Sequence, residues 1–188
     1  TTSFRKPFFD DHLFPVGMLR EQKKEIRRAD VILITSTPQN IKYEERNNFL
    51  NRIKIFYTGK VFFTRLRYSN SLFNLNHKIS DKTLAAKPFI LVTGIADSTG
   101  IVEYLKLNNY IFEHLKYSDH HNYSKNDFEL INKKGKSKII LTTEKDFGKL
   151  SLKLKSLKLY YIKVYLEFLN QSEAKTFNDL VKSRLSSM

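Results

Sequence analysis

The chain has 188 residues, 41% of them hydrophobic and 13% aromatic, which suffices for one good core or two small ones. It has no cysteine and no apolar run near the roughly 20 residues of a membrane span, which excludes disulfide frameworks and thiolate metal sites and indicates a reducing, cytoplasmic setting. The formal net charge of +14 predicts an acidic partner (nucleic acid, a phosphorylated substrate or an anionic membrane), although compositional drift could produce the same excess.

The first part of the chain combines basic, apolar and extended segments. The predicted elements are a basic helix at 19–29, a buried strand at 30–36, a helix at 43–55 and an extended segment at 60–68. Residues 69–86 are polar enough to be an excursion or a linker. We therefore expect two domains, 1–75 and 76–188.

The second part of the chain alternates strands with helices. The predicted elements are strands at 88–94, 110–117 and 137–143, helices at 99–108, 125–134 and 145–150, an extended run at 157–169 and a helix at 172–185. This alternation predicts an α/β domain whose parallel sheet carries helices on both faces. In the last helix, one face holds Phe177, Leu180, Val181 and Leu185, which we expect in the core.

A polar loop follows each of the three strands of this sheet. The loops are GIADS at 94–98, SDHHNYS at 118–124 and TEKDF at 143–147. Because the carboxyl ends of parallel strands meet at one edge, where open α/β folds bind ligands, these loops should converge in space. Asp97 and Asp146 could approach the middle loop there.

The middle loop contains the tripeptide Asp119-His120-His121. An aspartate that accepts from an imidazole fixes its tautomer, so this pair could serve proton transfer or orient another carboxylate. The alternative is a loop cap, with Asp119 bonding backbone amides before the next helix and both histidines exposed. A metal site is a poor third interpretation, because adjacent histidines cannot easily face one ion.

Four motifs in this order resemble the carboxyl-terminal half of the tetraacyldisaccharide 4′-kinases, the lipid A 4′-kinases. They are Pro15-x-Gly17-x-Leu19-Arg20-Glu21, Arg28-Ala29-Asp30, Asp119-His120-His121 and Thr143-Glu144-Lys145-Asp146. The resemblance is collinear through most of the chain.

The resemblance implies ATP-dependent phosphorylation of the 4′-hydroxyl of a lipid A disaccharide precursor, a tetraacyldisaccharide 1-phosphate, in lipopolysaccharide biosynthesis. It implies a peripheral enzyme at the inner face of the bacterial cytoplasmic membrane, with an anionic membrane surface and no specific nucleic acid as partner. It also implies that residues 1–75 are the tail of a P-loop NTPase-like α/β domain. Residues 60–68 and 160–169 would form a two-stranded hinge to the smaller α/β domain.

The resemblance also assigns residues. It implies that His120 partners a catalytic aspartate of the family's amino-terminal half, with Asp119 beside it, and that Arg20 and Glu21 lie toward the nucleotide and Mg²⁺. His121 and the Thr143, Glu144, Lys145 and Asp146 motif are substrate or structural residues. No residue is expected to ligate a metal directly.

One family element is absent from this sequence. No Gly-x-x-x-x-Gly-Lys-[Ser/Thr] motif occurs, so ATP and Mg²⁺ would be held largely by an amino-terminal half, and the chain alone should be inactive. Two other classes remain open. A DHH-type metal-dependent phosphoesterase shares the tripeptide but lacks its other aspartate motifs here, and a basic nucleic-acid-binding domain explains only the charge.

Overall fold

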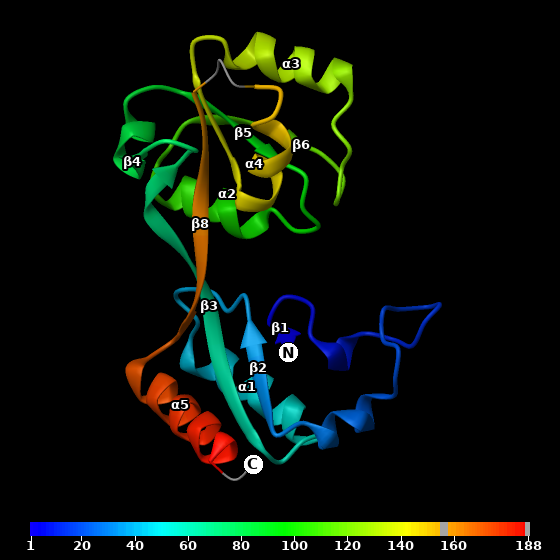
Figure 1. Cartoon of the computed structure of the whole chain (residues 1–188). Helices are drawn as coiled ribbons and strands as arrows, with labels where there is room; N and C mark the ends of the chain where they lie inside the picture. Colours follow the sequence, from blue (N-terminus) through cyan, green and yellow to red (C-terminus); the bar gives the residue numbers. More distant parts are fainter. Residues whose placement is uncertain (155–157, 187–188) are drawn as a thin grey trace. The chain divides into compact units, whose positions relative to one another are not determined.

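The computed structural model describes residues 1–154 and 158–186, which fold into two compact units (Figure 1). Unit 1 consists of Thr1–Arg67 and Leu166–Met188, and unit 2 of Tyr68–Tyr165. Two strands, β3 (Lys60–Phe73) and β8 (Lys158–Phe168), carry the chain between the units and are neighbours in the sheet. Two strands thus connect the units where the hinge is predicted, and their action as a hinge stays a prediction.

Unit 1 is built on parallel strands. Its elements are β1 (Thr2–Ser3), the 3-10 helices η1 (Phe8–Asp10) and η2 (Lys23–Arg28), β2 (Val31–Thr35), α1 (Tyr43–Lys54), the start of β3, the end of β8 and α5 (Gln171–Leu185). Strand β2 pairs in parallel with both β1 and β3.

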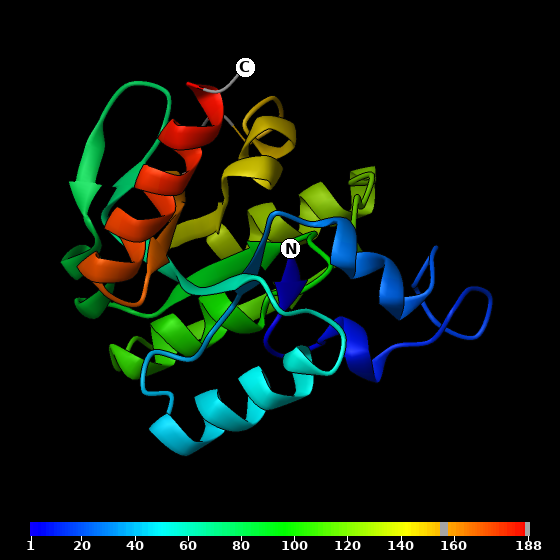
Figure 2. The same ribbon diagram turned by 90° about the horizontal axis from the view of Figure 1, so that it is seen from below.

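Successive residues of β3 place helices on opposite faces of this small sheet. Phe63 packs into a core with Ile34 of β2 and with Phe49 of α1. Its neighbour Phe62 faces the other way, where its ring centroid lies 5.4 Å from that of Phe177 in α5. Helices α1 and α5 thus cover the two sides of the sheet (Figure 2).

Two predictions for unit 1 are wrong. The basic helix expected at 19–29 is only the 3-10 helix η2, because Ile26 is the single apolar residue within it and offers no stripe to bury. In α5, Phe177 is partly buried, but Val181 and Leu185 are 39% and 68% exposed, not core residues. The aromatic contact of Phe177 engages only the first half of the helix face.

Unit 2 contains the longer series of alternating elements. These are the end of β3, β4 (Lys78–Ser80), η3 (Asp81–Ala85), β5 (Phe89–Thr93), α2 (Thr99–Leu107), β6 (Phe112–Lys116), α3 (Lys125–Gly135), β7 (Ile139–Thr143), α4 (Glu144–Leu150) and the start of β8. The order β8-β7-β5-β6 is parallel throughout, and β4 pairs antiparallel with β3.

The alternating side chains of β5 build two cores. Leu91 packs on one face with Ile101 and Leu105 of α2. Val92 packs on the other face in a cluster that includes Ile131 of α3 and residues of α4. The predicted parallel sheet with helices on both faces is confirmed.

The segment expected to be a linker is more ordered than its composition indicates. Residues 69–73 extend β3, and β4 and η3 follow, with Leu72 and Leu84 fully inside the core. Leu72 and Leu84 are too far apart in the sequence to give a recognisable period, although both are buried. Residues 166–188 lie in unit 1, whereas the predicted domain 76–188 includes them, and the domain ranges stay a prediction. Residue 157, the predicted start of the last strand, lies outside the described residues.

Candidate functional site

The three polar loops meet at the carboxyl edge of the unit 2 sheet, as their positions after the strands predict. The Tyr117 amide, after β6, donates to the Thr93 carbonyl at the end of β5, at 2.8 Å. The Gly94 amide donates to Asp146 Oδ2 in α4, at 2.8 Å. Lys145 Nζ lies 3.0 Å from Asp119 Oδ1. The edge therefore brings together residues from β5, β6 and α4.

Asp119 and His120 lie at the exposed tip of the middle loop. His120 has a φ of 56°, in the left-handed region that non-glycine residues adopt uncommonly and mostly at turns or functional sites. Its side chain is 78% exposed, and its Nε2 lies 3.8 Å from Asp119 Oδ2, which is too far for a hydrogen bond. The imidazole of His120 is thus open to solvent.

Two lysines of α4 hold this tip. Lys145 donates to Asp119, and that bond is the main reason why the pKa of Asp119 lies below its usual value. Lys149 Nζ donates to the carbonyls of His121 at 2.8 Å and of His120 at 3.3 Å. Asp119 therefore remains ionised at neutral pH, and the bonds from Lys149 hold the backbone of the tip.

His121, the other histidine of the loop, is held by contacts with neighbouring side chains. His121 Nε2 lies 3.0 Å from Asp127 Oδ2, and its ring packs against Tyr117 and Tyr123 with centroids 4.7 Å and 5.1 Å away. Asp127 also accepts from the amide and hydroxyl of Ser124, which caps α3. The bond from His121 is the leading cause of the lowered pKa of Asp127.

These contacts revise the loop-cap alternative. It predicted that Asp119 bonds backbone amides before the next helix and that both histidines are exposed. Asp119 does accept from the adjacent His120 amide, and it also bonds Lys145, whereas the cap of α3 is Ser124 with Asp127. His121 is partly buried. The carboxylate that bonds a histidine here is Asp127, not Asp119.

The Thr143-Glu144-Lys145-Asp146 motif forms the start of α4. Thr143 caps the helix by accepting from the Asp146 amide at 3.1 Å, and its hydroxyl donates to Asp146 Oδ2 at 2.8 Å. Asp146 is fully buried, whereas Glu144 is exposed in the first turn. Asp146 thus links β5, β7 and α4. Asp97 Oδ1 accepts from the Thr99 amide at the start of α2.

Polar side chains crowd closely around Gly94. Asp146 Oδ1 and Tyr123 Oη are buried without a hydrogen-bond partner among the described residues. Each lies 3.0 Å from the point where a Cβ on Gly94 would stand, and His121 Cβ lies 3.5 Å from it. Burial, followed by the charge of Asp146, raises the pKa of Tyr123. Glycine at position 94 lets these groups approach the backbone.

Arg20 and Glu21 belong to unit 1 and follow an exposed loop. Glu21 pairs with Arg28 of η2. At the base of the loop, Asp11 Oδ1 accepts from the amides of His12 at 2.7 Å and Met18 at 3.1 Å. These bonds lower the pKa of Asp11, with Met18 as the leading cause.

Three residues of the site were missed in the sequence: Tyr123, Asp127 and Lys149. A signal was available for Asp127, because Ser124 and Asp127 have the spacing of a capping box, which ties an acidic side chain to the loop. Lys149 is one helical turn after Lys145, so both lysines face the same loop.

Within residues 1–154 and 158–186, none of the helices has the length and apolarity that a bilayer-spanning segment requires. In the same part of the chain, His, Asp and Glu side chains form no group of three or more that could hold a metal ion.

Comparison with known proteins gives matches along almost the whole chain. The family profile described as tetraacyldisaccharide-1-P 4′-kinase matches residues 3–186. Proteins named tetraacyldisaccharide 4′-kinase are similar to it. That of Flavobacterium johnsoniae is 31% identical over 172 residues, covering 92% of this chain and 50% of the relative. That of Flavobacterium psychrophilum is 33% identical over 175 residues, with the same coverage. The chain thus spans about half the length of these relatives.

One solved structure has the same fold. The crystal structure of LpxK from Aquifex aeolicus in complex with ATP aligns with a TM-score of 0.56 and 21% identity, covering 93% of this chain and 49% of that one. The predicted α/β fold class is confirmed by this likeness.

Proposed function

The chain belongs to the tetraacyldisaccharide-1-P 4′-kinase family, and we propose that it is part of an ATP-dependent kinase acting on the 4′-position of a tetraacyldisaccharide 1-phosphate lipid A precursor. The family resemblance inferred from the four motifs is thereby confirmed. The proposed setting is lipopolysaccharide biosynthesis, with the protein peripheral at the inner, cytoplasmic face of the membrane. The proposed partners are the lipid precursor and an anionic membrane surface, without a specific nucleic acid.

The observation that carries the proposal beyond the family match is the exposed His120 at the edge loop. Its imidazole is open to an incoming group, while Lys145 and Lys149 hold the residues around it. We propose that His120 pairs with a catalytic aspartate supplied by the upstream half of the protein. An imidazole in such a pair orients the carboxylate and can take up the proton of the acceptor hydroxyl.

Asp119 and His121 have different proposed roles. Asp119 is a carboxylate close to His120, and a small rotation of either side chain would bring it within hydrogen-bond distance of the imidazole. We propose that it stabilises the protonated form of His120 during transfer. His121, bonded to Asp127 and stacked on Tyr117, is a positioning residue that shapes the loop. Thr143 at the end of β7 and Lys145 and Asp146 in α4 are proposed to support the loop, and Glu144 is proposed as a substrate contact.

The residues of this chain do not by themselves fit ATP with Mg²⁺. The sequence has no phosphate-binding Gly-Lys motif, and the Glu21 carboxylate is paired with Arg28. We propose that the upstream half holds most of both cofactors, with Arg20 and Glu21 as contributors from this chain.

The test uses a protein in which the upstream half is restored, either its own or that of the Flavobacterium johnsoniae relative. His120→Ala should lower kcat for 4′-phosphorylation by roughly 10²–10⁴, the contribution of an acid–base group. The melting temperature should stay unchanged, because the side chain is 78% exposed. His12→Ala, at another exposed histidine, is the control and should keep full activity. Equal activity of both variants would exclude His120 from the chemistry.

A further inference from the structure

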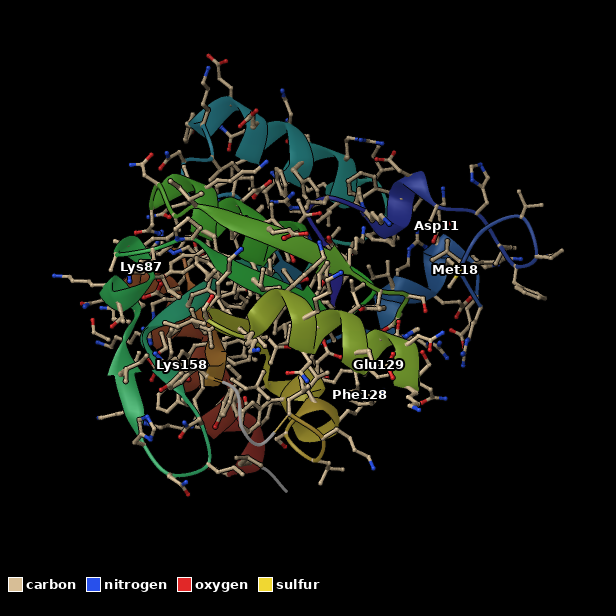
Figure 3. The ribbon with its side chains drawn as sticks, turned by 90° about the horizontal axis from the view of Figure 1, so that it is seen from above. Asp11, Met18, Lys87, Phe128, Glu129 and Lys158 are labelled. Carbon is tan, nitrogen blue, oxygen red and sulfur yellow. The ribbon has the colours of Figure 1, made fainter. Side chains whose placement is uncertain are left out.

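The loop between Asp11 and Leu19 in unit 1 ends in an entirely apolar tip, Leu13-Phe14-Pro15-Val16-Gly17-Met18. The exposed fractions are 45% for Leu13, 76% for Phe14, 83% for Val16 and 84% for Met18. Figure 3 shows this segment, with Asp11 and Met18 labelled, projecting from the rest of its unit. Large apolar side chains gathered this closely on a surface mark an interaction site.

The backbone of the tip is bonded within the loop. The Phe14 amide donates to the Leu19 carbonyl at 2.8 Å, and the Leu19 amide to the His12 carbonyl at 3.0 Å. The Gly17 amide donates to the Leu13 carbonyl at 3.0 Å, and the Met18 amide to Asp11 Oδ1 at 3.1 Å. An unbonded amide would cost several kcal/mol in hydrocarbon. This tip can therefore enter an apolar phase with these donors already satisfied.

Basic side chains follow the tip directly. They are Lys23, Lys24, Arg27 and Arg28, with Glu21 and Glu25 among them. Lys23 Nζ donates to the Phe9 carbonyl at 2.7 Å and Arg27 Nε to the Phe56 carbonyl at 3.4 Å, and these bonds leave the positive charge of both side chains in place. Both of these glutamates pair with Arg28. An apolar tip followed by cations is the arrangement that favours an anionic lipid surface, where the tip enters the acyl boundary and the cations contact phosphate.

We propose that residues 13–18 form a membrane-inserting loop that docks unit 1 on an anionic lipid surface. The inference rests on the peripheral location in the proposed function and extends it, because charge alone predicts binding that salt abolishes. An inserted tip adds a salt-independent component. The lipid is recognised as an anionic bilayer surface, not as an individual headgroup.

The sequence allows a clean reporter, because it contains no tryptophan. Phe14→Trp places the only tryptophan at the tip, and Leu75→Trp places it in the turn after β3, where Leu75 is exposed to the same degree, 75% against 76%. Each variant is titrated with vesicles of phosphatidylglycerol and phosphatidylcholine, without disaccharide or ATP. The emission of Phe14→Trp should shift to shorter wavelength and be quenched by brominated acyl chains, while that of Leu75→Trp should not.

A second measurement uses the chain without a tryptophan. Cosedimentation with the same vesicles at about 1 M salt, where the Debye length is about 3 Å, should retain the original chain and Leu75→Ser. Phe14→Ser with Met18→Ser should lower the partition coefficient roughly tenfold or more.

Three outcomes would contradict the proposal that this loop inserts into the membrane. The first is an equal emission response of the two tryptophan variants, and the second is binding that salt abolishes in every variant. The third is an emission shift of Phe14→Trp that appears when the upstream half of the protein is added and not when vesicles are added. That result would assign the tip to a protein partner. Because no kinase activity is measured, these outcomes leave the proposed function to its own test.

Discussion

Asp127 connects the histidine loop to the helix that follows it. Its Oδ2 lies 3.0 Å from His121 Nε2 and 2.8 Å from both the amide and the hydroxyl of Ser124. The folded-state pKa of Asp127 is lowered, chiefly by the bond from His121. A carboxyl group whose pKa falls on folding stabilises the protein above its unfolded pKa, about 3.9 for Asp. That stability is lost as the pH falls through the folded value.

Asp127→Asn should therefore destabilise the chain in a pH-dependent way. At pH 7 we expect the free energy of unfolding to fall by about 1 kcal/mol, as for other lost helix caps. The difference from the original chain should shrink as the pH falls below about 4. Denaturant unfolding across this range measures it. Glu129→Gln is the control on the same helix, where the carboxylate is exposed and 3.9 Å from Lys125. A deficit independent of pH would mean that the charge of Asp127 contributes nothing.

At this scale the sequence predicts which loop holds the site but not how its side chains pair. Adjacent Asp119 and His120 look like a hydrogen-bonded pair, yet the positive φ of His120 turns the chain so that their groups are 3.8 Å apart. The partner of His121 lies six residues on and is brought there by the cap of α3. Such pairing depends on backbone angles that the residue types do not determine.

The start of α4 is the element that organises the edge loops. Its Asp146 fastens Gly94 after β5, its Lys145 bonds Asp119, and Lys149 bonds the carbonyls of the histidine turn. Helix α4 is short, Glu144–Leu150, so its position depends on packing of Phe147 and Leu150 in the core. Changes that move this helix should disturb all three loops.

Substitutions of two glycines near this edge should change the free energy of unfolding in opposite directions. A Cβ on Gly94 would lie 3.0 Å from Asp146 Oδ1 and Tyr123 Oη, so Gly94→Ala should lower the free energy of unfolding by about 1–3 kcal/mol. Gly148, inside α4, has nothing within 4 Å of its Cβ position, so Gly148→Ala should raise it by about 0.5–1 kcal/mol. Thermal and denaturant unfolding of both variants measure this. A neutral Gly94→Ala would show that Asp146 and Tyr123 make room for the added methyl group without cost.

Elements with a strong period were predicted nearly residue for residue, as the strands and helices between residues 88 and 150 show. Their apolar faces are complete, because α2 and α3 each bury one side against the same sheet. The elements without a period were missed. The 3-10 helix η2 has one apolar residue, and the extension of β3 is stabilised by pairing with β4, a contact that local sequence does not encode.

At the scale of the whole molecule, the chain spans about half the length of its relatives. We expect the 188-residue chain alone neither to hydrolyse ATP nor to phosphorylate a lipid disaccharide, because its sequence has no phosphate-binding Gly-Lys motif. A phosphate-release assay and a radiolabelled transfer assay measure this, with the restored protein as positive control. Turnover above that of a heat-inactivated sample would contradict the expectation.

The division of the chain between the units has a consequence for the order of events on the ribosome. Unit 2 is one continuous segment, Tyr68–Tyr165, so it can complete its core as soon as that segment has emerged. Unit 1 cannot, because Glu173 of α5 accepts from the Phe63 amide and pairs with Arg46, both synthesised more than a hundred residues earlier. Domains tend to fold as units during synthesis. One face of the unit 1 sheet therefore stays uncovered by α5 in the nascent chain while unit 2 folds. During this interval a chaperone could bind the exposed apolar face.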